Sequence, residues 1–235
     1  MTRATDIQRE LKSLGDAQTA LFSQRFFKTG AGEYGEGDLF RGIRVPVLKR
    51  IARDYKDLSL AEALKLLHSP YHEDRLVALL IMNNQFGRRN DLTRKAIYQS
   101  YLKNTQYINS WDLVDASAPQ IVGGFLWDKD RRVLSKLARS KSLWRRRIAV
   151  LATFHFIKRG ETSDTLNIAS ILLSDSEDLI HKAVGWMLRE VGKRNLQSEE
   201  EFLKQHYRRM PRTMLRYAVE RFPAPKRQCY LKGKI

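Results

Sequence analysis

The stretch "SKSLWRRRIAVLATFHFIKRG" (140–160) decides the fold prediction. A polar start leads into a basic cluster, and a long apolar run with helical spacing then ends in basic residues. The stretches "SPYHEDRLVALLIMNNQFGRR" (69–89) and "SDSEDLIHKAVGWMLREVGKR" (174–194) follow the same plan. Each carries an early basic residue, in turn Arg75, Arg147 and Lys182. Arg147 and Lys182 are 35 residues apart, close to the period of helical-pair repeats.

Helical spacing also dominates the rest of the chain, while strictly alternating strand patterns are nearly absent. One glycine-rich stretch, 28–42, reads as a long irregular loop. The segment 105–125 reads as a degenerate repeat. We therefore expect an all-α fold, a curved α-solenoid with a concave basic face in a single domain over 1–235. An irregular all-α bundle is the alternative. The clearest expected helices are 45–56, 60–68, 74–86, 143–159, 164–173, 179–194 and 213–222.

The charge is the outlying property of the composition. Lysine and arginine total 43 against 26 acidic residues, which gives a net charge of +17 and a pI near 10.1. Such a balance predicts attraction to polyanions, with nucleic acid ahead of an anionic membrane. A membrane is the weaker interpretation because no apolar run approaches the ~20 residues that span a bilayer. The chain start also lacks a signal-peptide pattern.

Cysteine and histidine usage gives no sign of a metal centre. Cys229 is the single cysteine, which excludes an intrachain disulfide and a multi-cysteine zinc site. His68 and His72 have the i, i+4 spacing of a helical ligand pair, but Pro70 lies between them and favours a turn. We expect no metal, no cofactor and a reducing, cytoplasmic location near the nucleoid.

Basic residues recur at matching places in the repeats. In a solenoid, equivalent positions line up in space, so these residues predict a positive stripe suited to a duplex backbone. A solvated charged face is the alternative. The residues are Arg88, Arg89, Arg145, Arg146, Arg147, Arg189, Lys193 and Arg194.

The stretch "INSWDLVDASAP" (108–119) places a tryptophan and a carboxylate one helical turn apart. Ser110 is a plausible N-cap, and Asp112 in the first turn complements the helix dipole. Asp115 lies beyond that turn, and Pro119 cannot donate to its carbonyl, so the helix is weakened there. From the residues alone, Asp115 is equally well explained by an ion pair or by a functional role.

Trp186 repeats this association of an indole with charged residues. It lies four residues after Lys182 and three before Arg189, so it shares a helix face with two cations. That neighbourhood is unusual for a fully buried indole. The adjacent Gly185 is expected to leave room for another molecule to approach.

The motifs "SWDLVD", "WRRRIAV" and "HKAVGWMLRE" resemble those of the AlkD-like alkylpurine DNA glycosylases, which are built from HEAT-like repeats. The resemblance covers most of the chain. By motif it implies an active groove formed by Trp111, Asp115, Arg147 and Trp186. It also places Phe26 of "QRFFK" near the lesion, where a tyrosine-to-phenylalanine difference removes a hydroxyl donor.

The implied reaction is hydrolysis of the N-glycosidic bond of N3- or N7-alkylated purines in double-stranded DNA. Such a purine is already cationic and leaves without a general acid, so one carboxylate, Asp115, suffices to stabilise the oxocarbenium-like sugar. The tryptophans would contact the deoxyribose, and Arg147 the adjacent phosphate.

We expect a monomeric, monofunctional enzyme. The expected DNA-binding residues are Arg145, Arg146, Arg147, Lys182, Arg189, Lys193 and Phe26. Two other hypotheses remain: a non-catalytic DNA-structure binder, and a helical-repeat scaffold for an acidic protein.

Overall fold

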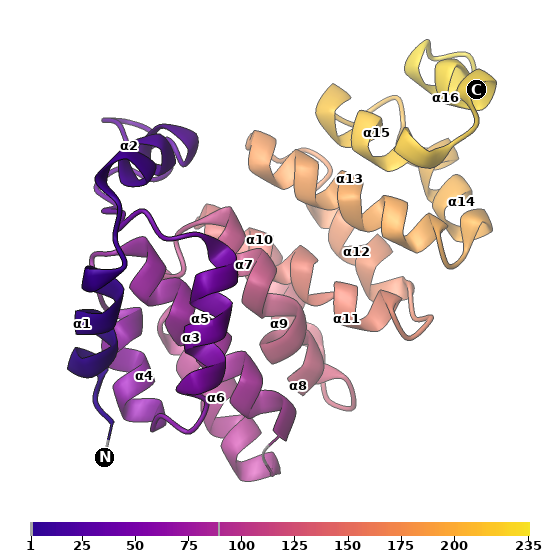
Figure 1. Cartoon of the computed structure of the whole chain (residues 1–235). Helices are drawn as coiled ribbons and strands as arrows, with labels where there is room; N and C mark the ends of the chain where they lie inside the picture. The colour runs from indigo at the N-terminus through magenta and orange to yellow at the C-terminus, as the bar shows by residue number, and fades with distance from the viewer. Residues whose placement is uncertain (1, 89) are drawn as a thin grey trace. The chain divides into compact units, whose positions relative to one another are not determined.

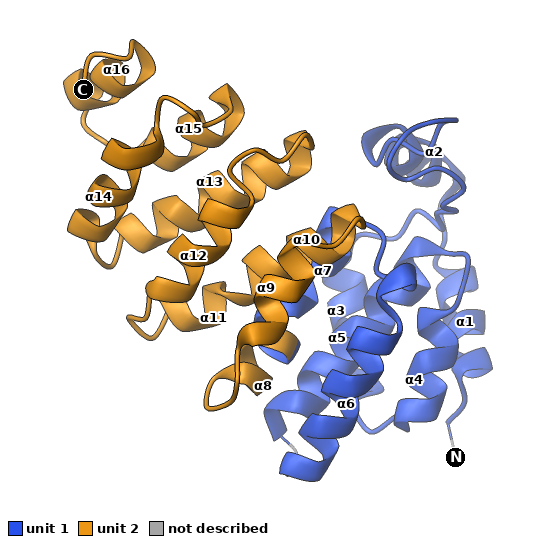
Figure 2. Ribbon diagram, turned by 180° about the vertical axis from the view of Figure 1, so that it is seen from behind, with its two compact units in different colours: residues 1–121 blue, residues 122–235 orange. Residues whose placement is uncertain are grey.

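The computed structural model describes residues 2–88 and 90–235, and it divides the chain into two compact units (Figure 2). The first comprises residues 1–121 and the second residues 122–235. Each unit is described by itself, and the single domain expected over 1–235 stays a prediction.

The first unit is organised around one long helix, α5 (Figure 1). Side chains around most of the circumference of this helix are buried. It packs against α3, α4, α6 and α7, while α1 packs against α4. None of the residues of α2 is buried. The elements are α1 (Ala4–Ser13), α2 (Ala17–Phe26), α3 (Val45–Asp54), α4 (Leu60–Leu67), α5 (His72–Arg88), α6 (Asp91–Lys103), η1 (Thr105–Tyr107) and α7 (Trp111–Ala118).

In the second unit the central helix is α13, whose apolar side contacts α10, α14 and α15. A π-helical turn, Pro119–Gly123, precedes its first helix. The elements are α8 (Gly124–Leu126), α9 (Arg132–Ala138), α10 (Leu143–Ala152), α11 (Phe154–Ile157), α12 (Ser163–Ile171), α13 (Asp178–Gly192), α14 (Leu196–His206), α15 (Arg212–Ala218), η3 (Val219–Arg221) and α16 (Ala224–Leu231).

The all-α prediction is confirmed: over residues 2–88 and 90–235, a single bridge between Leu39 and Tyr71 is the only strand-like pairing. The irregular loop is also found, since no helix lies between Phe26 and Val45. The helix expected over 143–159 is interrupted. The buried Thr153 hydroxyl donates to the carbonyl of Val150 at 2.6 Å, and α11 begins at the next residue.

The repeats align one residue away from the predicted register. Arg75 donates to the carbonyl six residues before it, that of Ser69, at 3.3 Å. Arg146, not Arg147, makes the same bond to Ser140 at 3.1 Å. His181, not Lys182, donates to the carbonyl of Asp175 at 2.5 Å. The 35-residue spacing survives between Arg146 and His181, but the matching of Arg75 with Arg147 is wrong. We call these three bonds the repeat lock.

The expectation that Gly185 leaves room for another molecule is also wrong. A Cβ atom at this position would lie 2.4 Å from the carbonyl oxygen of Met214 and 2.5 Å from the Cβ of Tyr217. The space is therefore filled by α15, and the glycine allows α13 and α15 to pack closely.

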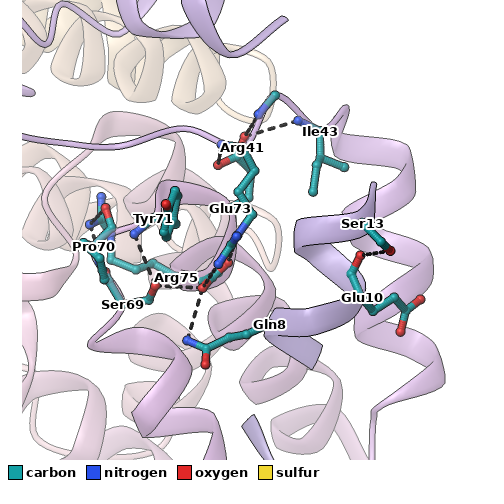
Figure 3. A network of polar contacts seen from close by, with 12 residues as sticks. Gln8, Glu10, Ser13, Arg41, Ile43, Ser69, Pro70, Tyr71, Glu73 and Arg75 are labelled. Carbon is teal, nitrogen blue, oxygen red and sulfur yellow. Dashed lines mark hydrogen bonds and ion pairs between the residues drawn. The ribbon is translucent and has the colours of Figure 1, made fainter. Parts of the chain in front are cut away.

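The irregular loop is attached to α5 by a run of charged residues (Figure 3). The carboxylate of Glu73 accepts the backbone N–H groups of residues 41–43 at 2.8–3.2 Å. Asp74 takes a bidentate ion pair from Arg41 at 2.6 and 2.9 Å, and Arg75 pairs with Asp38 at 2.6 Å. These charged groups are largely buried, and each is held by hydrogen bonds or an ion pair. They therefore fix the course of the loop beside the start of α5.

Candidate functional site

Trp111 is the first residue of α7 and is half-buried. The backbone of Ser110 has the extended conformation of an N-cap, with φ −144° and ψ 153°, but its side chain makes no capping hydrogen bond. The predicted N-cap position is therefore confirmed, and the predicted capping bond is not found. After Ala118 the helical conformation continues through Pro119, with φ −59° and ψ −42°, as the π-helical turn Pro119–Gly123. The α-helical bonding thus changes at the proline, where its missing N–H predicts a weakened helix.

An aromatic cluster covers the indole of Trp111. The ring of Phe27 stacks on it with centroids 5.4 Å apart and an angle of 17° between planes. Phe26 meets it edge-on at 6.0 Å and is itself 56% exposed. The structure thus brings Phe26 to Trp111, two residues that the sequence placed in one candidate site.

These rings line a cavity of about 660 Å³ within the first unit. Phe22 and Phe40 continue its aromatic wall, and the side chains of His72 and Asp112 contribute polar atoms. A cavity with this lining accommodates flat or apolar groups, because aromatic and aliphatic side chains supply most of its surface.

Asp112 occupies the first turn of α7, as predicted, and its structural role includes an ion pair. Its Oδ2 lies 2.8 Å from Nε2 of His72, a side chain with only 3% of its surface exposed. Burial on its own lowers the pKa of His72, but the bonded Asp112 and the nearby Asp38 outweigh burial and raise that pKa to about 9. His72 is therefore a buried cation at neutral pH.

Asp115 lies one turn beyond Trp111 and is half-buried. Its charge acts on the phenol of the fully buried Tyr101, which shares a hydrogen bond of 2.9 Å with Ser117. Burial raises the pKa of Tyr101, and the negative charge of Asp115 raises it further. The neighbouring Leu113 and Val114 are fully buried and belong to the core of the first unit.

In the second unit, Arg147 is buried, with 5% of its surface exposed. Its Nη1 donates to the carbonyl of Leu179 in the first turn of α13 at 2.6 Å. The guanidinium therefore joins α10 to α13. Its predicted contact with a DNA phosphate stays a prediction.

Trp186 is half-buried on α13, as its cationic neighbourhood suggested. Its Nε1 donates to Oε1 of Glu190 at 3.2 Å, and its ring lies 5.8 Å from that of Phe154. These two contacts fix the orientation of the indole.

Four of the basic residues predicted for DNA binding have carboxylates beside them. Arg145 and Lys193 are exposed, while Arg89 lies outside the described residues. A charge that is already paired contributes less to phosphate binding, because the pair must be broken or shared. The ion pairs are Arg146 with Asp175 at 2.6 Å, Lys182 with Asp178 at 2.8 Å, Lys193 with Glu190 at 2.6 Å, and Arg189 with Glu220.

The four predicted catalytic residues belong to two units. Trp111 and Asp115 lie on α7 of the first unit, and Arg147 and Trp186 lie on α10 and α13 of the second. Within their units, Trp111 is held by Phe27, Arg147 by the carbonyl of Leu179, and Trp186 by Glu190. Their joint role in one groove stays a prediction.

The sequence prediction missed three residues beside the candidate site: His72, Phe27 and Glu190. His72 was considered only as a metal ligand, although its place in the run "HEDR" (72–75) signals a charged helix start. Over the part of the chain that the structure describes, no group of three or more His, Cys, Asp or Glu side chains could hold a metal ion. No helix in that part is long and apolar enough to cross a bilayer.

The comparisons with known proteins agree with this all-α fold. The profile of the DNA alkylation repair enzyme family matches residues 7–222. A solved structure described as a "Predicted DNA alkylation repair enzyme from Enterococcus faecalis" superposes with a TM-score of 0.70. It is 17% identical and covers 89% of this chain and 97% of its own. No curated protein matches the sequence significantly.

The fold and the site define a class of protein: an all-α repeat protein with a half-buried Trp–Asp pair at the start of a helix. The family match spans nearly the whole sequence, so the chain belongs to the DNA alkylation repair enzyme family. Membership places the protein in DNA repair, with DNA as its substrate. At 17% identity, the solved structure shows that the helical-repeat fold is shared.

Proposed function

We propose that the protein is a monofunctional DNA glycosylase that hydrolyses the N-glycosidic bond of N3- or N7-alkylated purines in duplex DNA. The observation that carries the proposal is the pair Trp111 and Asp115, one turn apart and half-buried on α7, in a chain of the DNA alkylation repair family. The half-buried position leaves a carboxylate and an indole able to meet a substrate.

The chemistry needs few groups because the alkylated purine carries its own positive charge. As the glycosidic bond lengthens, positive charge moves to the sugar, and a fixed carboxylate stabilises that charge more than it stabilises the ground state. Asp115 supplies this charge or orients the attacking water. Trp111 supplies a π face for the sugar and the cationic base.

The residues of the second unit would hold the DNA beside the lesion. Arg147 supplies a guanidinium that is bound through Nη1 to the carbonyl of Leu179, and a guanidinium is suited to phosphate recognition. Trp186, oriented by Glu190, offers a second indole face. In this proposal both residues contact the deoxyribose-phosphate backbone.

The Asp115→Asn substitution tests the proposal. It keeps the shape of the side chain and removes the charge, so release of 7-methylguanine from methylated duplex DNA should fall by at least about a hundredfold. The affinity of the variant for the same duplex should stay within about tenfold of the wild-type affinity. The substitution removes only a negative charge, which does not attract phosphates. Single-turnover base release and fluorescence anisotropy measure the two quantities.

The matched control is Asp54→Asn, the same change at an exposed aspartate at the end of α3. It should leave both quantities unchanged. Full base release by the Asp115→Asn variant would overturn the catalytic assignment and favour a protein that binds DNA without hydrolysing it.

A further inference from the structure

A buried cluster of four charged side chains lies behind Trp111. His72 pairs with Asp112 at 2.8 Å, and its Nδ1 lies 3.7 Å from Asp38, which pairs with Arg75 at 2.6 Å. At most 7% of each side chain is exposed, except for 17% at Asp112. With His72 protonated, two cations balance two carboxylates. The catalytic proposal assigns no role to this cluster.

The cluster is tied to the chain on both sides of Trp111. On one side, the side-chain amide of Asn109 donates to Oδ1 of Asp38 at 3.0 Å. On the other side, Asp112 is held by His72. Ser110, the N-cap residue, contributes no side-chain bond. The first turn of α7 is therefore anchored by the charge cluster in place of a side-chain cap.

A second connection runs through aromatic rings. The imidazole of His72 lies 4.7 Å from the ring of Phe40 and 4.8 Å from that of Phe27. Phe27 in turn stacks on Trp111 at 5.4 Å. His72 thus supports the indole of Trp111 in two ways. It pairs with Asp112, which follows Trp111 in the chain, and it contacts Phe27, which stacks on Trp111.

We propose that His72 is a positioning residue for the glycosylase reaction, which holds Trp111 in place through its ion pair with Asp112 and its contact with Phe27. The inference rests on the proposed function. In this proposal His72, whose side chain is 3% exposed, acts through Trp111 and not on the reacting bond. Its effect is to keep the indole and the start of α7 in a fixed orientation.

The charge of His72 is the property on which this support depends. The groups facing it are Asp112 from α7, Asp38 from the loop and Arg75 from its own helix, while Glu73 is turned to the backbone of residues 41–43. Since their balance raises the pKa of His72 to about 9, the imidazolium persists at neutral pH. Its deprotonation leaves the cluster with an unbalanced carboxylate and weakens the bond to Asp112.

The test combines base release with a direct signal from Trp111. The whole chain is labelled with 5-fluorotryptophan, and the resonance of Trp111 is assigned with a Trp111→Phe variant. In the wild-type protein this resonance should shift with a midpoint near pH 9. The shift should be absent from the His72→Gln variant. This measurement needs no substrate and, in the wild type, no substitution.

His72→Gln should also lower single-turnover base release by about ten- to a hundredfold, while duplex affinity changes by less than about threefold. The control is His68→Gln. His68 bonds to Asn104 at 2.7 Å and lies on the ring of Tyr107, so its loss should change neither the Trp111 resonance nor base release.

The outcomes separate the two proposals. A wild-type protein that releases no alkylated base overturns the glycosylase assignment. A Trp111 resonance that does not respond between pH 7 and about pH 10, or responds equally in the His72→Gln variant, overturns the positioning role. Unchanged base release by a folded His72→Gln variant overturns it as well.

Discussion

Adjacent arginines on α10 have different surroundings. Arg145 is exposed. Arg146 makes a bidentate pair with Asp175 at 2.6 and 3.3 Å and also donates to two backbone carbonyls. A partner-rich, largely buried guanidinium stabilises the fold only as long as its carboxylate stays paired. Because Arg145 is exposed, a phosphate can approach its guanidinium more easily than that of Arg146.

The substitutions Arg145→Ala and Arg146→Ala should consequently separate binding from stability. Arg145→Ala should reduce the slope of log K against log salt for duplex binding by about 1, with little effect on unfolding. Arg146→Ala should lower the free energy of unfolding by about 3 kcal/mol, because Asp175 is left buried and unpaired. Anisotropy titrations in salt and urea unfolding measure the two effects; equal effects of both variants on the slope would contradict this division.

At the scale of elements, the contact between α13 and α15 depends on Gly185. The atoms that a Cβ would meet are a backbone carbonyl and a Cβ, and neither can move without shifting α15. Gly87, in the last turn of α5, has only the side-chain amide of Gln120 within reach, at 3.9 Å. Glycine is therefore required for helix packing at position 185 and can be replaced at position 87.

Gly185→Ala should destabilise the protein by about 2 kcal/mol or more, because overpacking forces the two helices apart. Gly87→Ala should instead stabilise it by up to about 1 kcal/mol, since alanine loses less backbone entropy in a helix. Urea unfolding of both variants checks the opposite signs. A neutral Gly185→Ala variant would show that α15 yields to the added methyl group.

The sequence predicted the elements better than it predicted their connections. Apolar spacing located the helices, and the i, i+4 relation put Trp111 and Asp115 one turn apart on α7. The ion partners could not be read in this way. Arg146 and Asp175 are 29 residues apart, and Arg189 and Glu220 are 31 apart, so only the packing of the helices brings them together.

The register of the repeats was missed for a similar reason. Three consecutive arginines, Arg145 to Arg147, satisfy any pattern that asks for a basic residue. Only the direction of each side chain shows that Arg146 reaches back to the carbonyl of Ser140. The positioning role of His72 was missed because its spacing from His68 suggested only a metal ligand. That role depends on Asp38, Asp112 and Phe27, which the fold assembles around it.

At the scale of the whole molecule, each unit contains a buried group whose pKa is raised to about 8 or 9. In the first unit this group is His72, with a pKa of about 9. In the second it is Glu199, 2% exposed, where burial together with the charge of Glu200 raises the pKa to about 8. Both groups bind a proton more tightly in the folded chain than in the unfolded chain, so folding is linked to proton uptake.

The stability contributed by both protons should therefore be lost as pH rises. For Glu199 the loss runs from its unfolded pKa near 4.5 to about 8, and for His72 from near 6.5 to about 9. Between pH 6.5 and about 8, unfolding should release up to two protons. The free energy of unfolding should therefore fall by up to about 3 kcal/mol per pH unit. Urea unfolding across this range measures the slope.

The variants Glu199→Gln and His72→Gln should each reduce that slope by about one proton. A wild-type slope near zero would show that neither group holds its proton more tightly in the folded state. A slope that only one variant reduces would assign the linkage to that group.

The repeat lock has a use beyond this chain. Two of its three donors are arginines, and the third, His181, occupies the same place with a shorter side chain. In all three bonds, a side chain donates to the backbone carbonyl six residues before it. This gives a rule for designing an idealised array: a polar residue supplies the carbonyl, and an arginine six positions later supplies the donor. Repeated every 35 residues or so, this short motif could serve as a consensus joint for designed helical arrays, separable from the residues of the candidate site.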